Sequence, residues 1–499
     1  MKKENLLIAI LIALIACINE SKISAQTATI TFTADKNVGV RIYKPIDNAF
    51  NSYVVSNEIV FTPNGEVDYQ VPVVDFCFVM CEYTDGSKYV LVLEDGSHLK
   101  VQYTEAGIKM QGDNSEGIIY YNNEYINKGL LPYRHKIDSI FTTNIDGNIN
   151  FEAIDTDILN EKANSYQKDI EKMKEEGLVT PRFATILLQD LQYAYNYIVF
   201  DIYQNVLAGR INNYKPTLSD SLAIKEQIEK FYDVPTLLNE NTLKYRYASV
   251  FPYYSFMYRN METKAKDELL KSSGEDEDTF GPHVARLLAP DYIQKPLLGS
   301  AFVVQFKYML NEFDKNKMLS YFERRFPDSE YIPVIKEYIN TEKAKENDQT
   351  TSDSPSIIEE DVQSLKELTG LEGIQGKYIY IDLWATWCIP CKQEFQYNKD
   401  VHKLLDTYSN LAAVYISMDE DQFDKKWRND VKQFSLTGYN LRASEALQKD
   451  ILKRIYKGSK TYNIPLYVLI DPEGNIIDDN LPRPSSIDKL KAVFDEVLK

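Results

Sequence analysis

Cysteine and histidine are scarce in this chain of 499 residues, which contains five cysteines and four histidines. Small secreted folds that depend on disulfides for stability carry far more cysteine, so a disulfide-stapled scaffold is excluded. Structural zinc sites need four cysteine or histidine ligands, commonly supplied as two pairs. One C-x-x-C pair is present, Cys388 and Cys391, and the single histidine of that region, His402, is expected on a solvated helix face. We therefore expect no metal site.

Positive charge is also in short supply. Lysine and arginine number 56 against 74 aspartates and glutamates, which gives a net charge of −18. A chain with this balance lacks the electrostatic attraction that nucleic acids and anionic membrane surfaces exert on basic proteins. We therefore expect no nucleic-acid partner. The length is too great for a single hydrophobic core and indicates roughly two to four domains.

Long apolar runs are confined to the N-terminus. Two lysines precede the run Leu6–Ile18, which is short for a membrane-spanning helix and typical of a signal peptide. The longest later candidate, Phe183–Val206, carries polar and acidic residues, and its apolar residues mark one face of an amphipathic helix. The N-terminal run therefore predicts a protein that works outside the cytoplasm, in the periplasm or cell envelope.

Two ways of processing this segment remain open. Leu14–Cys17 resembles a bacterial lipobox, which predicts a lipoprotein signal at residues 1–16 and a lipidated Cys17. Ile23–Ala25 instead offers a small-residue cleavage site, which predicts a signal peptide at residues 1–25. Membrane contact is expected only if Cys17 is lipidated.

The composition changes along the mature chain. Residues 26–113 alternate in short runs separated by turns such as Asp85-Gly86 and Asp95-Gly96, which predicts an antiparallel, sandwich-like β-domain. Residues 114–339 have helical periodicity and predict an all-α middle region without a catalytic constellation. Residues 340–361 are polar and charged, as in a linker, and residues 362–499 form the last domain. The clearest predicted helices are Leu159–Glu176, Pro181–Leu207, Ser219–Phe231 and Leu297–Phe313, followed by a pair within Leu319–Ile339 that is capped by Asp328 or Ser329.

Two further cysteines, Cys77 and Cys81, lie in an apolar stretch that reads as a strand. Residues four apart on a strand share a face but are separated by about 13 Å, so the two cannot form a disulfide without a bulge. Buried free cysteines are the favoured interpretation. The alternative is that they form a resolving or relay pair for a redox site at Cys388 and Cys391.

The segment Lys377–Glu394, KYIYIDLWATWCIPCKQE, carries the chemistry. Tyr378–Leu383 reads as a strand that is covered on both faces, and an amphipathic helix follows the cysteines. Cysteines three apart on the first helical turn bring their sulfurs close enough to close a small disulfide ring. Because Cys388 sits at the helix N-terminus, exposed amide groups favour its thiolate, which is the attacking species in disulfide exchange.

These residues resemble the active-site segment of the thioredoxin superfamily, in the subgroup of TlpA/ResA-like thiol-disulfide oxidoreductases. A distant segment supports the resemblance: Thr461–Pro484 is similar to the family's strand that opens with a cis-proline, here Pro465, and continues into a hairpin. The resemblance covers roughly residues 356–499 and implies an α/β thioredoxin fold. The order of domains resembles the multidomain arrangement of Bacteroidetes relatives.

The resemblance also implies roles for individual residues. Cys388 would be an exposed attacking thiolate and Cys391 the buried resolving thiol. Asp382 matches the buried aspartate beneath the second cysteine, and Glu394 matches an acidic residue of the ResA-like subgroup that would assist it. The predicted substrate-binding residues are Trp387, Ile464 and Pro465. A solvated position for Glu394 remains an equal alternative.

The predicted function is extracytoplasmic exchange of disulfides, most simply reduction of disulfides in exported proteins by the dithiol of Cys388 and Cys391. The resemblance implies a membrane electron donor of the DsbD/CcdA kind, no dissociable cofactor, and apoproteins of cytochrome c biogenesis as one client class. Two alternatives stay open. The same cysteines could serve a disulfide oxidant or isomerase, or the helical body could be the main element of a cell-envelope binding protein.

Overall fold

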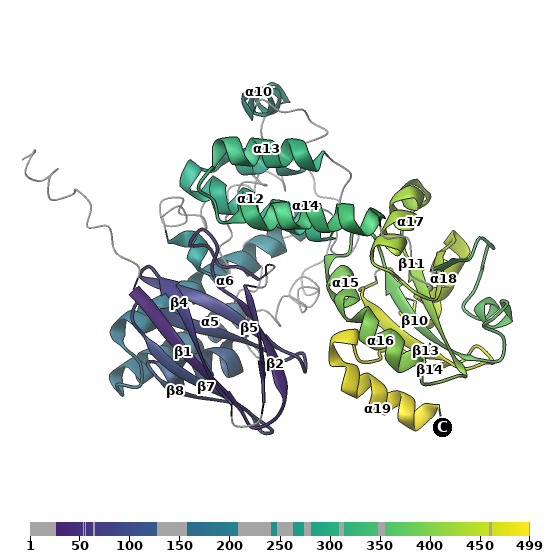
Figure 1. The fold of residues 1–499 in the computed structure, drawn as a ribbon, viewed down its shortest axis with the longest axis horizontal. Helices are drawn as coiled ribbons and strands as arrows, with labels where there is room; N and C mark the ends of the chain where they lie inside the picture. Colours follow the sequence, from purple (N-terminus) through teal and green to yellow (C-terminus); the bar gives the residue numbers. More distant parts are fainter. Residues whose placement is uncertain are drawn as a thin grey trace, which may run out of the picture. The chain divides into compact units, whose positions relative to one another are not determined.

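The computed structural model describes residues 26–126 (without 53, 55, 63 and 64), 157–207, 241–246, 263–273, 281–308, 314–347, 355–458 and 462–498. The predicted signal segment with Cys17 and the predicted helix Ser219–Phe231 lie outside these residues. The chain divides into two compact units (Figure 1), one of Met1–Ser300 with Arg325–Tyr331 and one of Ala301–Arg324 with Ile332–Lys499. Within the described ranges, no helix combines the length and apolarity needed to cross a membrane.

The first unit begins with two four-stranded sheets, ordered β4-β1-β7-β8 and β3-β2-β5-β6. Their strands are β1 (Gln26–Ala34), β2 (Val38–Tyr43), β3 (Asn57–Phe61), β4 (Glu66–Val73), β5 (Phe76–Tyr83), β6 (Lys88–Glu94), β7 (His98–Thr104) and β8 (Gly107–Gly112). Gly86 and Gly96 adopt φ angles of 83° and 75° in the turns that the sequence predicted. The antiparallel prediction fails for one pair, β1 and β7, which run parallel because the chain passes through the other sheet between them.

One hydrophobic core joins these sheets to helices. Along β1 every second side chain is buried, including Ala28, Ile30 and Phe32, and Phe32 meets Phe61 of β3 at a ring distance of 6.1 Å. The same core contains buried residues of α5 (Asp157–Glu175) and α6 (Pro181–Leu207). It therefore includes residues on both sides of the predicted boundary after residue 113.

The other helical elements of the middle region are short or of moderate length. They are α2 (Ser115–Tyr120), the π-helix η1 (Tyr121–Ile126), the 3-10 helices η4 (Thr242–Lys244) and η5 (Gly281–Leu288), and the α-helices α10 (Thr263–Ser273), α12 (Asp291–Tyr308), α13 (Lys315–Arg325) and α14 (Tyr331–Asn347). Of the two predicted caps for α14, Ser329 is the one used, since its Oγ accepts a hydrogen bond from the Tyr331 amide at 3.2 Å.

The C-terminal region is an α/β fold around a six-stranded sheet of order β14-β13-β10-β11-β12-β9. The strands are β9 (Ser356–Ile357), β10 (Tyr378–Trp384), β11 (Leu411–Ser417), β12 (Tyr439–Arg442), β13 (Leu466–Ile470) and β14 (Ile476–Asp478). β10 runs parallel to β11 and antiparallel to β13. The strand β9 and the end of α14 both fall within the segment that the sequence marked as a linker.

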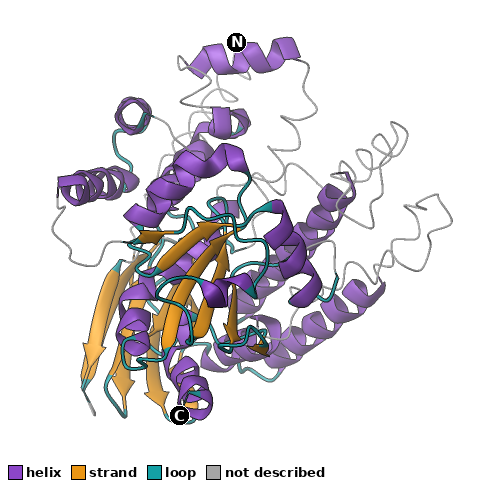
Figure 2. Cartoon of the chain, turned by 90° about the vertical axis from the view of Figure 1, so that its right-hand side faces the viewer, coloured by secondary structure: helices purple, strands orange, loops and turns teal. Residues whose placement is uncertain are grey.

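Helices cover both faces of this sheet (Figure 2). They are α15 (Ile389–Glu394), α16 (Asn398–Leu405), α17 (Asp424–Gln433), α18 (Glu445–Arg454) and α19 (Ile487–Val497), with the 3-10 turns η6 (Glu367–Gly370), η7 (Phe395–Tyr397), η8 (Asp421–Phe423) and η9 (Pro484–Ser486). The odd-numbered residues of β10, such as Ile381, pack with Leu447 of α18. The even-numbered Tyr380 packs with α16 and α19, and Trp384 packs with the cysteines. The predicted α/β class of this region is confirmed.

Candidate active site

The central strand β10 delivers the two cysteines. After Trp384, the Cys388 amide donates to the Ala385 carbonyl at 3.0 Å and closes a tight turn whose middle residues are Thr386 and Trp387. Cys388 then adopts an extended conformation (φ −84°, ψ 95°) and caps helix α15. The turn connects strand β10 to Cys388, the N-cap residue of α15, so the turn determines where the Cys388 sulfur lies.

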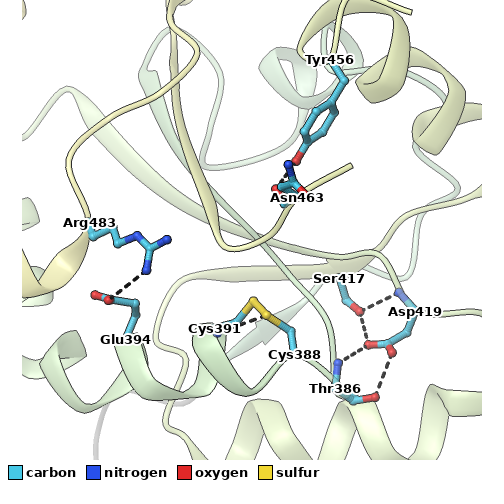
Figure 3. The surroundings of a disulfide bond; sticks show 9 residues. All are labelled: Thr386, Cys388, Cys391, Glu394, Ser417, Asp419, Tyr456, Asn463 and Arg483. Atoms are coloured by element: carbon cyan, nitrogen blue, oxygen red, sulfur yellow. Dashed lines mark hydrogen bonds and ion pairs between the residues drawn. A yellow bond between two sulfur atoms is a disulfide. The ribbon is translucent and has the colours of Figure 1, made fainter. Parts of the chain in front are cut away.

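The structure joins Cys388 and Cys391 in a disulfide with a Cα–Cα distance of 5.3 Å (Figure 3). The Cys391 amide donates to the Cys388 sulfur at 3.1 Å. Such a donor stabilises negative charge on that sulfur once the disulfide is reduced, which favours the thiolate.

The exposure predicted for Cys388 is wrong for this state. Its side chain is 3% exposed and that of Cys391 is fully buried, whereas Trp387 is 53% exposed. The cysteines pack among Trp384, Phe395 and other apolar side chains, and Ile464 lies against the same cluster. The exposed face beside the disulfide is therefore formed by Trp387 and not by the sulfurs.

Asp382 lies on the even-numbered face of β10, between Tyr380 and Trp384, which is the face that the cysteine-bearing helix covers. Its side chain is 1% exposed, which confirms the predicted burial. Its Oδ1 atom has no hydrogen-bond partner among the described residues. Burial raises the pKa of Asp382 well above its ordinary value, and the charge of Glu394 adds to this effect.

Three tyrosines extend this buried site. Tyr380 and Tyr467 stack with their ring centroids 6.0 Å apart, and the Tyr415 hydroxyl lies 3.1 Å from Nε2 of His402. Burial raises the pKa of each tyrosine well above its usual value, and the Asp382 charge contributes in every case. His402, predicted on a solvated helix face, is half-buried there and contacts the Tyr415 hydroxyl.

Glu394 is buried as well, which removes the alternative of a solvated glutamate. Its Oε2 accepts a hydrogen bond from the Ser485 amide at 2.9 Å, and its Oε1 accepts one from the Ser485 hydroxyl at 3.2 Å. Arg483 places Nη1 3.8 Å from Oε1. These partners, which the sequence analysis did not identify, come from the segment after β14, and no local pattern links it to α15.

The peptide bond between Ile464 and Pro465 is cis, as the family resemblance predicted, and Pro465 directly precedes β13. On the N-terminal side, the carbonyl of Asn463 accepts a hydrogen bond from the Tyr456 hydroxyl at 2.7 Å (Figure 3). Because Ile464 also packs against the cluster that contains the cysteines, this loop borders the disulfide.

A second buried aspartate lies beside the turn that leads to the cysteines. Asp419 follows β11, and its carboxylate contacts Thr386 of the cysteine turn and Ser417 at the end of β11 (Figure 3). No local sequence pattern singled out this residue. The available signal was its place two residues after a buried strand parallel to β10, because the carboxyl ends of parallel strands share one edge.

A buried ion pair fixes the helix on the far side of the cysteines. Lys392 follows Cys391 directly, and its Nζ lies 2.5 Å from Oδ2 of Asp430 in α17, which Lys426 also contacts at 3.0 Å. Burial lowers the pKa of Lys392, and the Asp430 charge opposes that effect. The pair therefore anchors α15 to α17.

Neither a metal centre nor a second disulfide is found among the residues that the structure describes. No group of three or more histidine, cysteine or acidic side chains in these ranges is arranged to hold a metal ion. Cys77 and Cys81 are buried free thiols in β5, as the favoured interpretation predicted. Burial raises the pKa of both thiols to about 12.

Comparison with known proteins places the similarity in the C-terminal region. The thioredoxin-like family model matches residues 376–476. The chain is 28% identical over 127 residues to the thiol-disulfide oxidoreductase ResA of Bacillus thuringiensis, across 26% of this chain and 66% of that protein. For ResA of Bacillus subtilis the identity is 26% over 133 residues, across 27% and 68%. The chain thus spans about two thirds of the length of these relatives.

Among solved structures, a thiol-disulfide oxidoreductase from Bacteroides fragilis is similar at 23% identity with a TM-score of 0.22. The match covers 25% of this chain and 87% of that one.

Proposed function

We propose that this chain, whose C-terminal region belongs to the thioredoxin-like family, is a thiol-disulfide oxidoreductase that reduces disulfides in exported proteins. The observation that carries the proposal is the Cys388–Cys391 disulfide at the start of α15. The buried Asp382, whose Oδ1 has no hydrogen-bond partner among the described residues, supports it from β10. The similarity to ResA enzymes supports the same reaction class.

The reaction begins from the dithiol form. The Cys388 thiolate attacks one sulfur of a substrate disulfide, so that a mixed disulfide forms and the other substrate sulfur leaves as a thiolate that takes up a proton. Cys391 then loses its proton and attacks the Cys388 sulfur. The protein disulfide closes, and the second substrate sulfur leaves as a thiol. Two electrons and two protons pass from protein to substrate.

To Asp382 we assign the movement of the Cys391 proton. A buried thiol holds its proton tightly, and a carboxyl whose pKa is raised well above the ordinary value can exchange a proton with it near neutral pH. Glu394 acts on this exchange through its charge, because its own oxygens are engaged by Ser485 and Arg483.

Direction and location complete the proposal. Ile389 and Pro390, between the cysteines, add neither charge nor an imidazole that would stabilise the reduced form, which favours a reductant over an oxidant or isomerase. The N-terminal signal segment supports function in the periplasm or cell envelope, with membrane attachment through Cys17 if it is lipidated. A membrane donor of the DsbD/CcdA kind would restore the dithiol, and exported apoproteins such as those of cytochrome c biogenesis are clients of fitting chemistry.

The midpoint potential of the Cys388–Cys391 couple tests this function. The full chain is equilibrated with thiol buffers, and the matched variant Cys77→Ala serves as a control that should leave the couple unchanged. A potential near or below about −200 mV supports a reductant, whereas one near −120 mV indicates an oxidant. The absence of any reversible couple would refute the exchange function altogether.

A further inference from the structure

The carboxylate of Asp419 is held by three hydrogen bonds next to the cysteine turn (Figure 3). Its Oδ2 accepts from the Thr386 amide at 2.8 Å and from the Ser417 hydroxyl at 2.6 Å, and its Oδ1 accepts from the Thr386 hydroxyl at 2.8 Å. The Ser417 hydroxyl also accepts from the Asp419 amide at 3.2 Å. Both carboxylate oxygens are therefore engaged by donors.

The sheet explains why these groups meet. β10 and β11 are parallel, and Trp384 stands opposite Ser417 at their carboxyl ends. The Met418 amide donates to the Trp384 carbonyl at 2.8 Å, which extends the pairing by one residue. The following residue, Asp419, consequently lies beside the turn that leaves β10.

The groups around the Asp419 carboxylate are hydrogen-bond donors. Thr386, Ser417 and Asp419 are each no more than 1% exposed, so water does not compete for these hydrogen bonds. All three partners present donors to Asp419, and an ionised carboxylate is purely an acceptor. Hydrogen bonds of this charge-assisted kind are shorter and stronger than neutral ones.

The held residue is part of the turn that places the nucleophile. Thr386 is the first middle residue of the turn closed between Ala385 and Cys388. The hydrogen bonds to Asp419 fix its backbone amide and its hydroxyl two residues before Cys388. Fixing that turn also sets the outward position of Trp387. The Asp419 carboxylate is bonded to Thr386, two residues before Cys388. Both Asp419 and Thr386 are buried, and electrostatic effects are stronger at buried sites than in water.

We propose that Asp419 is a positioning residue for Cys388: it rigidifies the turn that carries the nucleophile, and its fixed negative charge disfavours the Cys388 thiolate, which favours the disulfide form. The inference rests on the exchange function proposed above. It attributes part of the reducing character of the Cys388–Cys391 couple to a residue outside the C-x-x-C segment. The effect of the Asp419 charge is opposite to that of the Cys391 amide, whose hydrogen bond to the Cys388 sulfur favours the thiolate.

Two substitutions separate charge from shape. Asp419→Asn keeps the size of the side chain and removes its charge, whereas Asp419→Glu keeps the charge and alters the geometry. Asp400→Asn removes an exposed carboxylate of α16 and is the control for net charge. The thiol pKa of Cys388 is read from the pH dependence of its alkylation, and the potential from equilibration with glutathione, both on the full chain.

An electrostatic role and a purely structural role of Asp419 predict different results. In Asp419→Asn the alkylation midpoint of Cys388 falls by about one pH unit, as expected when a nearby like charge is removed. The equilibrium constant for forming the disulfide falls up to tenfold, which raises the potential by about 30 mV. Asp419→Glu and Asp400→Asn stay close to the wild type. Unchanged alkylation and potential in a folded Asp419→Asn protein would reduce Asp419 to a structural residue and overturn the proposal.

The turn itself has a separate test. Thr386→Val removes one donor, keeps the side-chain shape and leaves the charge of Asp419 in place, so it remains informative if Asp419→Asn does not fold. It is expected to slow the reduction of insulin about threefold to tenfold while the potential remains that of the wild type. An unchanged rate would overturn the positioning role. A wild-type protein without a reversible couple would instead contradict the underlying function, so the two failures are distinguishable.

Discussion

Two aspartates of neighbouring strands, Asp382 within β10 and Asp419 just after β11, are equally buried but have opposite hydrogen-bonding environments. Each is 1% exposed. Asp419 meets three donors, whereas Oδ1 of Asp382 has no hydrogen-bond partner in the described part of the chain. Burial alone favours the neutral acid, and donors directed at the carboxylate reverse that preference. The comparison shows that the partners decide the charge of a buried acid.

The two environments follow from where each residue stands relative to its strand. Asp382 is inside β10, where the backbone amides are used by the sheet and the face is lined by tyrosines. Asp419 stands beyond the end of β11, where the free amide and hydroxyl of Thr386 are available. The first position suits the proton exchange that we propose for Asp382, and the second suits the positioning role that we propose for Asp419.

Replacing the proton-exchanging acid should have the largest effect. Asp382→Asn is expected to slow the closure of the Cys388–Cys391 disulfide about 100-fold at neutral pH, within the range for loss of a general base. In the wild type the rate should rise with pH as the Asp382 carboxyl ionises, and in the variant that rise should disappear. Stopped-flow measurement of the release of a mixed disulfide across pH 5–9, roughly the range in which buried carboxyls and thiols titrate, tests this.

Asp400→Asn, an exposed acid on α16, is the matched control and should retain the wild-type profile. If Asp382→Asn kept both the rate and the pH dependence, the proton path would have to run through another group.

Stability should change in opposite directions at the two sites. The folded pKa of Asp382 is raised, so its contribution to stability is present at low pH and is lost as pH rises through that pKa. Asp382→Asn should therefore become more stable than the wild type above about pH 4. Each unit by which the folded pKa of Asp382 is raised corresponds to roughly 1.4 kcal/mol. Asp419→Asn should instead lose about 2 kcal/mol at neutral pH, because it removes a charged acceptor.

Tryptophan fluorescence during denaturant unfolding measures both effects, since all three tryptophans, Trp384, Trp387 and Trp427, lie in the C-terminal region. Changes of the same sign in the two variants would contradict the comparison.

The smallest effect is expected at Glu394, which is intermediate between the two aspartates. Ser485→Ala removes the hydroxyl at 3.2 Å and leaves the amide at 2.9 Å, so one of the two hydrogen bonds persists. We expect a loss of about 1 kcal/mol in stability, measured by the same fluorescence, and less than a threefold change in insulin reduction. A loss as large as that of Asp419→Asn would show that the amide contact does not survive alone.

Residues whose role is set by local sequence were predicted best. The strand pattern predicted the burial of Asp382, and Pro181 marked the first residue of α6. The cis bond before Pro465 followed from the family resemblance. Ser485 and Asp419 were missed because their partners lie 91 and 33 residues away, and only the strand register and the return of the chain after β14 bring them together. The exposure of Cys388 was predicted wrongly because the apolar packing around the sulfurs comes from several elements.

The two thiols of β5 have a practical consequence for following this protein in its own environment. With a pKa of about 12, Cys77 and Cys81 are thiolates in only about one molecule in 10⁵ at neutral pH. A reagent that consumes thiolates therefore passes over them while the chain is folded and finds them once it is denatured. Among the described cysteines, the label that Cys77 and Cys81 take up only after denaturation is an internal standard for the amount of protein. The label taken up by the native protein, divided by this standard, gives the fraction of the Cys388–Cys391 pair that is reduced at the moment of sampling.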